Sequence, residues 1–235
     1  MRQGFGFSAI KRKLVIVAIS AMMIVPAAAS MFSETKRLAE RGDANAQIDT
    51  GFMYDYGAGV DQDYRRAMEW YLKAAAQGKP AAQYNIGVLY QEGRGVKQDY
   101  AKAMEWFMKA GAQNYPDAQY NIGVLYEKGH GVRKDSIKAM KSFLKAAAQN
   151  HPEAQYNIGV FYNEGLGVKQ DYVKAMKWFL IASAQDYPSA QYNIGVLYVN
   201  GLGVRQNYKA AREWFGKACD NGSQEGCDKY KLLNR

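Results

Sequence analysis

The stretch Ala82-Gln83-Tyr84-Asn85-Ile86-Gly87-Val88 decides the fold, because it returns three more times at one fixed spacing. The copies occupy 118–124, 154–160 and 190–196, each start lying 36 residues after the last, and a diverged copy begins at Ala46. A period of this length is typical of a solenoid, in which each repeat buries its apolar face only by stacking on its neighbours. We therefore expect five repeats, at 46–81, 82–117, 118–153, 154–189 and 190–225.

Each repeat is expected to form two helices joined by a loop. In the first helix (helix A), a glycine lies among apolar residues at helical spacing. Because glycine costs about 1 kcal/mol inside a helix relative to alanine, its recurrence indicates a close approach of another helix. The second helix (helix B) follows an N-cap residue, such as Asp99, and carries an apolar stripe that includes Met104 and Phe107. The helix A glycines are Gly51, Gly87, Gly123, Gly159 and Gly195.

The fold class predicted from this pattern is all-α, a right-handed α-solenoid of helix-turn-helix repeats with a 36-residue period. Residues 30–45 are expected to form an N-terminal capping helix, and residues 226–235 a C-terminal one.

Residues 1–29 are typical of a signal peptide. Basic residues precede the apolar run 14–25, small residues follow it, and the run is too short to span a bilayer. We expect cleavage after Ala29 and a periplasmic or secreted protein without a transmembrane span. The chain carries a net charge of +9, of which four basic residues lie in 1–29, leaving +5 on the exported part. This interspersed charge favours solubility and an acidic partner over nucleic acid.

The two cysteines, Cys219 and Cys227, lie near the end of the last helix B and in the trailing helix. An exported chain with an even number of cysteines is typical of disulfide bonding. A helical hairpin brings such positions within reach of the required Cα separation. We therefore expect a structural disulfide in preference to a redox-active pair.

The pattern Ala-x-Tyr-Asn-Ile-Gly-x-x-Tyr, then Gly-x-Gly-Val, then Asp-Tyr-x-Lys-Ala-x-x-Trp-Phe-x-Lys-Ala, resembles the Sel-one-like repeat (SLR) family, relatives of tetratricopeptide repeats. The resemblance spans 46–225 and implies adaptors, assembly factors or exported binding proteins. It also implies that the A helices line a concave groove in which asparagines bind a peptide backbone, although the first repeat has Asp49 instead.

The tyrosines at the third position of helix A are expected to point away from its main apolar stripe, next to these asparagines. The implied partner-binding residues are Tyr84, Asn85, Tyr120, Asn121, Tyr156, Asn157, Tyr192 and Asn193. Alternatively, the tyrosines pack against the next repeat and the asparagines bond to neighbouring loops.

No coherent catalytic, cofactor or metal site is predicted. His130 and His151 fall in loops at opposite ends of the helices, ~18 Å apart, so we expect two exposed histidines that share no metal. Ser33 and Ser142 each begin a Ser-x-x-Lys match, but the accompanying Ser-Asp-Asn and Lys-Thr-Gly elements of β-lactam enzymes are missing. Ser136 and Ser142 stand where other repeats have aromatic residues, which indicates a thinner patch and a local pocket.

These observations predict an exported, non-enzymatic, monomeric scaffold or adaptor that binds a protein or peptide on its concave face. Two alternatives remain open. One is a periplasmic immunity protein that neutralises a secreted toxic enzyme of the lipase type. The other is a β-lactam-binding hydrolase like some cysteine-rich SLR proteins.

Overall fold

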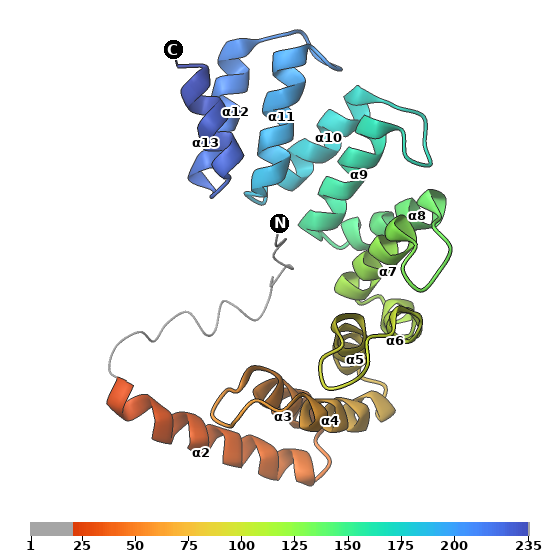
Figure 1. Cartoon of the computed structure of the whole chain (residues 1–235), viewed down its shortest axis with the longest axis vertical. Coiled ribbons are helices and arrows are strands. Elements are labelled where there is room, and N and C mark those ends of the chain that lie inside the picture. The colour runs from red at the N-terminus through yellow and green to blue at the C-terminus, as the bar shows by residue number, and fades with distance from the viewer. Residues whose placement is uncertain (1–20, 235) are drawn as a thin grey trace. The chain divides into compact units, whose positions relative to one another are not determined.

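The computed structural model describes residues 21–234, and every regular element within that range is a helix (Figure 1). The described residues form twelve helices and no strand, which confirms the all-α repeat fold. The helices are α2 (Ala21–Glu40), α3 (Ala44–Tyr56), α4 (Tyr64–Ala76), α5 (Pro80–Glu92), α6 (Tyr100–Ala112), α7 (Pro116–Lys128), α8 (Ser136–Ala147), α9 (Pro152–Glu164), α10 (Tyr172–Ser183), α11 (Pro188–Asn200), α12 (Tyr208–Asp220) and α13 (Gln224–Leu232).

The described residues form two compact units, residues 21–110 and residues 111–234, whose boundary falls inside α6. In the first unit α2, α3, α4 and α5 pack in chain order. In the second, each helix from α7 to α13 packs on the one that follows it. Neighbours in sequence are therefore neighbours in space, as stacked helical hairpins require.

Helix B begins and ends where the sequence predicts. The side chain of Asp63 accepts hydrogen bonds from the first backbone N–H groups of α4, and Asp135 and Asp171 cap α8 and α10 in the same way. After helix B the chain turns through a left-handed residue, for example Asn150 with φ 62° and Asp186 with φ 56°. Asparagine and aspartate tolerate this conformation better than most residues, so the turn is encoded locally.

The helix A glycine lies directly against an aromatic ring of helix B. A Cβ atom at Gly87 would lie 2.6 Å from the ring of Phe107, and one at Gly195 would lie 2.6 Å from the ring of Phe215. Both rings are at most 1% exposed. The predicted close approach of the helices is therefore confirmed.

The first described helix packs on the first complete repeat. In α2, the Phe32 ring lies edge-on 5.2 Å from the ring of Tyr54, and the backbone of Ala28 contacts Gly59. This helix continues through Ala29, the predicted cleavage position, and the rest of the predicted signal peptide, residues 1–20, lies outside the described residues. Since α3 already begins at Ala44, the capping helix ends earlier than the predicted residue 45.

The last helix, α13, is fixed to α12 by a disulfide. Cys219 and Cys227 are bonded, with their Cα atoms 4.5 Å apart, and the hydroxyl of Ser223 caps α13. The expected disulfide is present, and it joins the terminal helix to the last complete repeat.

Candidate functional site

The helix A tyrosines of the second unit pack inward. The ring centroids of Tyr120 and Phe143 are 5.8 Å apart, and those of Tyr156 and Phe179 are 5.7 Å apart. Tyr192 stands 5.4 Å from its own helix B phenylalanine. Each ring covers the phenylalanine of its own repeat and stays half-exposed, a packing that the expected orientation away from the main apolar stripe of helix A did not include.

The hydroxyls of these tyrosines reach the asparagines of the following repeat. The side-chain amide of Asn193 donates to the Tyr156 hydroxyl at 3.4 Å, and Asn157 is hydrogen-bonded to the Tyr120 hydroxyl. Asn121 is only 6% exposed. The tyrosines and asparagines at Tyr120, Tyr156, Tyr192, Asn121, Asn157 and Asn193, called here the ladder, thus connect consecutive repeats through side chains.

The first unit contains one further pair of predicted site residues, Tyr84 and Asn85. The ring of Tyr84 lies 5.7 Å from that of Phe107, and both Tyr84 and Asn85 are half-buried. In the first repeat the corresponding residues are Ile48 and Asp49, and burial raises the pKa of the Asp49 carboxyl from its usual value. The tyrosine–asparagine pair is therefore present from the second repeat onward.

His151 is not an exposed loop residue, which corrects the sequence-based expectation. Only 9% of its side chain is exposed, and its ring stacks on that of Tyr120 with centroids 4.8 Å apart. Its Nδ1 accepts the backbone N–H of Ala154 at 3.3 Å, and Nε2 lies 3.2 Å from a carboxylate oxygen of Asp117. The histidine caps α9 and covers the start of the ladder. The other histidine, His130, is exposed in the A–B loop.

Charge is segregated between the two kinds of helix in the second unit. The A helices α7, α9 and α11 carry four acidic residues and one basic residue. The B helices α8, α10 and α12 carry eight basic and two acidic residues. Although the whole chain has a positive net charge, the side of the second unit formed by α7, α9 and α11, called here the A-helix side, is acidic. Its charged residues are Asp117, Glu127, Glu153, Glu164 and Lys128.

Buried phenols and carboxylates share this acidic side. Burial raises the pKa of Tyr115 and of Tyr120 to about 12, and neighbouring carboxylates, Asp117 and Glu153 respectively, raise it further. Burial and then Glu153 also raise the pKa of Tyr187, whose ring lies 5.2 Å from that of Tyr156. These hydroxyls stay protonated at neutral pH and remain hydrogen-bond donors.

A buried glutamine at the start of helix A links three helix segments, a role that the sequence analysis missed. Gln119 donates to the carbonyl of Gly111 at 3.1 Å and accepts from Gln149 at 2.8 Å. In the next repeat, Gln155 accepts the equivalent hydrogen bond from Gln185 at 2.9 Å. Each bond ties the start of helix A to the end of a helix B. The available signal was the recurrence of glutamine directly after the first alanine of every repeat.

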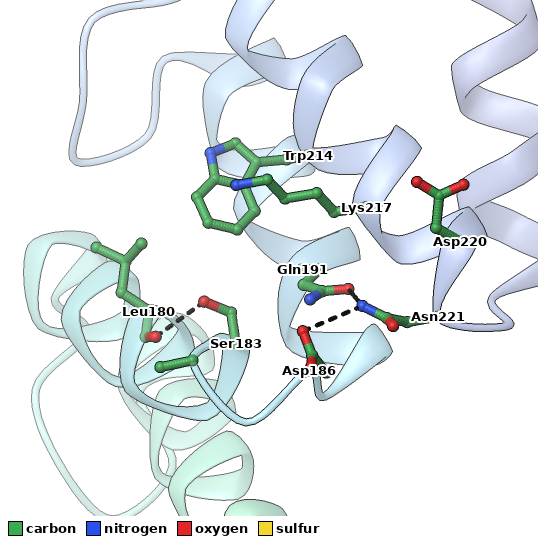
Figure 2. A pocket seen from close by; sticks show the side chains of 9 residues that line it. Leu180, Ser183, Asp186, Gln191, Trp214, Lys217, Asp220 and Asn221 are labelled. Atoms are coloured by element: carbon green, nitrogen blue, oxygen red, sulfur yellow. Dashed lines mark hydrogen bonds between the residues drawn. The ribbon is translucent and has the colours of Figure 1, made fainter.

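A depression of about 500 Å³ lies beside the last of these glutamines, between α10 and α12 (Figure 2). Asn221 donates to Gln191 at 3.0 Å and also reaches Asp186 at 3.5 Å. The ammonium of Lys217 lies 4.1 Å from the centroid of the Trp214 ring. These polar groups mainly bind one another, so the depression serves the packing of the last repeat.

The two serines of the Ser-x-x-Lys matches are engaged by their own helices. Ser33 donates to the carbonyl of Ala29 and Ser142 to that of Lys138, both at 3.0 Å. Within residues 21–234, no three His, Cys, Asp or Glu side chains are grouped to hold a metal ion. None of the described helices is both long and apolar enough to cross a membrane.

Comparison with solved structures places this arrangement among SLR proteins. The c5321 protein, a protective antigen of uropathogenic Escherichia coli with an SLR fold, is 38% identical, with a TM-score of 0.80. The match covers 83% of this chain but only 42% of c5321, so the chain spans less than half the length of that relative. A Sel1 repeat protein from Oxalobacter formigenes is 28% identical over 85% of this chain and 88% of its own, with a TM-score of 0.76.

An immunity protein from Pseudomonas aeruginosa, Pa5087, shares the fold at 19% identity and a TM-score of 0.55, over 86% of this chain and 75% of its own. A search of curated proteins found no match. The Sel1 repeat family model matches five consecutive segments, residues 44–79, 80–115, 116–151, 152–187 and 188–223. Because these segments cover most of the sequence, the chain belongs to the Sel1 repeat family.

Proposed function

We propose that this protein is an exported, non-catalytic scaffold that holds a segment of a partner protein against the A-helix side of residues 111–234. Sel1 repeat proteins are generally protein-interaction scaffolds. The acidic, tyrosine-rich A-helix side is the observation that supports this site, because the other helices of the same unit carry the opposite charge.

The partner segment is proposed to be positively charged. Burial raises the pKa of the Tyr156 phenol, and the charges of Glu164 and Glu127 raise it further, which indicates that these carboxylates lie near the ring. Arginine and lysine bind such a combination through ion pairs and through cation–π contacts with tyrosine faces. This partner chemistry reverses the expectation drawn from the overall net charge.

The predicted site residues have unequal roles in this proposal. The asparagines Asn157 and Asn193 are bonded to tyrosine hydroxyls, so they support the surface and a partner meets the tyrosine edges first. Tyr156 and Tyr192 are half-buried and therefore keep part of their rings available. The partner-binding residues proposed on this side are Tyr120, Asn121, Tyr156, Asn157, Tyr192 and Asn193, whereas Tyr84 and Asn85 lie in the first unit and stay a prediction of the sequence pattern.

Charge reversal tests the proposed surface. The double variant Glu127→Lys and Glu164→Lys makes the A-helix side basic, whereas Lys141→Glu and Lys177→Glu makes an equal change on exposed positions of the B helices. In pull-downs from a periplasmic extract, the first variant is expected to lose a partner that the wild type and the second variant retain. Equal recovery of that partner by all three proteins would contradict the proposed site.

Export is supported by the leader-like sequence of residues 1–29 together with the disulfide between Cys219 and Cys227. Disulfides persist in oxidising compartments and are rare in the bacterial cytoplasm. Cell fractionation checks this part independently. The disulfide-bonded protein, shortened by cleavage after Ala29, is expected outside the cytoplasm, and full-length protein that stays in the cytosol would refute export.

The immunity alternative remains a separate hypothesis. Pa5087 carries that name, but its identity to this chain is 19%, which supports the fold alone. The same pull-down distinguishes the two roles, because an immunity protein retains a toxic enzyme as its main partner and abolishes the activity of that enzyme. Hydrolysis of a β-lactam, abolished in Ser142→Ala, would support the remaining alternative, although the Ser142 hydroxyl is bonded to a backbone carbonyl.

A further inference from the structure

The third repeat contains an open depression of about 730 Å³ at its A–B loop. It is lined by Tyr126 at the end of α7, by residues 132–138 of the loop and the start of α8, and by Gly167 of the following loop. All of these residues lie in the second unit. The depression lies at Ser136, one of the two serines that replace an aromatic residue in this repeat, whereas Ser142, the other, is not among its lining residues.

In the other repeats a tyrosine occupies the position of Ser136. Tyr64 in the first repeat and Tyr172 in the fourth pack against the apolar cores of their repeats. Where Tyr100 and Tyr208 stand, the hydroxyl accepts a hydrogen bond at 3.1 Å from a glutamine two residues earlier. The tyrosine and the glutamine thus form one recurring local unit.

The third repeat has lost both members of that unit together. Lys134 replaces the glutamine, and Ser136 replaces the tyrosine. The paired replacement removes an aromatic ring and adds a positive charge at the rim of the depression.

The backbone around the missing ring has kept its arrangement. A Cβ atom at Gly167 would lie 2.9 Å from the carbonyl carbon of Ser136, and one at Gly203 would lie 2.6 Å from that of Tyr172. The loop with Gly167 therefore approaches α8 about as closely as the loop with Gly203 approaches α10. Since the loop has not moved in to fill the space, the position of the ring remains open.

The lining suits a negatively charged aromatic group. Tyr126 offers a ring face at the base, and the ammonium of Lys138 lies 5.3 Å from its centroid. Arg133 and Lys134 are exposed at the rim. The single lining carboxylate, Asp135, caps α8 and lies 3.7 Å from the ammonium of Lys138, so Arg133 and Lys134 give the lining its positive charge.

We propose that this depression binds an aromatic side chain of a partner protein that has acidic residues beside it. The ring takes the place that tyrosine fills in the other repeats, stacking on Tyr126. The flanking carboxylates pair with Arg133 and Lys134. The site adjoins the A-helix side, since Tyr126 directly precedes Glu127 in α7, but it has the opposite charge preference and does not rest on the proposed function.

Three short peptides test the site by NMR titration of the purified protein. Acetyl-Glu-Tyr-Glu-amide is expected to bind in the millimolar range and to shift the backbone amide signals of Tyr126 and Gly167. Acetyl-Glu-Ala-Glu-amide lacks the ring and acetyl-Lys-Tyr-Lys-amide has the wrong charge, so each is expected to bind at least about tenfold more weakly. Equal binding of all three peptides, or no shift with any of them, overturns the proposal.

The matched variant restores the pattern of the other repeats. The double substitution Lys134→Gln and Ser136→Tyr fills the site with the chain's own ring, and is expected to abolish binding of the acidic tyrosine peptide while preserving or raising the melting temperature. Val173→Tyr adds a ring at a position that is 51% exposed and is expected to leave binding unchanged. Peptide binding that survives the double substitution in a folded protein overturns the proposal.

Discussion

The junction between the first and second repeats differs chemically from the junction between the fourth and fifth. At the first junction the buried carboxylate of Asp55, 4% exposed, accepts a hydrogen bond from the guanidinium of Arg94 at 2.7 Å. At the equivalent positions of the later junction stand Asn163 and Leu202. One repeat backbone thus accommodates either a buried ion pair or a neutral pair.

A second difference lies in the core beside the ion pair. The first repeat has Tyr71, fully buried, at the position where the later repeats have phenylalanine, such as Phe215. Burial raises the pKa of Asp55 in spite of Arg94, which lowers it. The first junction therefore carries a desolvation cost that the later junction avoids, and its stability depends on keeping both charges together.

The largest expected effect comes from breaking the ion pair. Arg94→Leu introduces the residue found at 166 and 202, but it leaves the Asp55 carboxylate buried without its cation. We expect a loss of about 3–5 kcal/mol in the free energy of unfolding, measured by urea denaturation.

The double variant Asp55→Asn and Arg94→Leu is the matched control. It converts the first junction to the Asn163 and Leu202 chemistry of the later one, and should recover most of the lost stability. A single variant as stable as the wild type would show that the ion pair contributes nothing.

The glycine–ring contact lies inside each repeat and is common to the first and the fifth, so breaking it tests what the two ends of the array share. Gly51→Ala places a methyl group 2.6 Å from the ring of Tyr71, and Gly195→Ala does the same at Phe215. We expect each to destabilise its unit by about 2–3 kcal/mol in thermal or urea unfolding. Gly216→Ala, whose methyl group meets only Tyr230 at 3.2 Å, is the control, with a neutral effect or a gain of up to about 1 kcal/mol.

The disulfide distinguishes the two ends of the repeat array. The double variant Cys219→Ala and Cys227→Ala opens a short loop between α12 and α13, and we expect the second unit to lose about 2 kcal/mol. Hydrogen exchange should rise mainly in α13, with α2 unchanged. If the protection of α13 from hydrogen exchange is unchanged after removal of the disulfide, packing alone fixes the helix.

The smallest expected effect is a dependence on pH at the first junction. Because burial raises the folded-state pKa of Asp55 above its usual 3.8, the ionised carboxyl costs stability at neutral pH. That cost is relieved as the pH falls through the folded-state pKa. Relative to the double variant Asp55→Asn and Arg94→Leu, the wild type should therefore gain stability between pH 7 and 4, measured as the difference between their urea midpoints. A difference that is flat across this range would contradict the raised pKa.

Local features of the fold were predictable because the repeat displays them many times. The period, the caps such as Asp135 and the glycine contacts such as that of Gly87 all follow from the preferences of single residues. The bond between Cys219 and Cys227 followed from compartment and position. Each of these features requires only residues within one repeat or one hairpin.

Features that join different repeats escaped the sequence analysis. Asp55 and Arg94 are 39 residues apart in the sequence, which is slightly more than one period, and they belong to different repeats. Only the stacking of the two repeats brings them together. His151 was assigned to an exposed loop because its stacking on Tyr120 depends on tertiary packing. The packing of each tyrosine ring on the phenylalanine of its own repeat was missed, because the helix A pattern alone does not reveal that the helix B ring reaches it.

The glutamine bonds have a consequence for how such a chain grows. Gln119 and Gln155 each donate to a backbone carbonyl of the preceding repeat, that of Gly111 and that of Ala147, and each accepts from a glutamine of its own repeat. A duplicated segment of one period inherits a complete set of donors and acceptors at both of its borders. Tandem copies of the gene segment then join without leaving buried polar groups unpaired. The array can therefore gain or lose a repeat during evolution at little cost in stability.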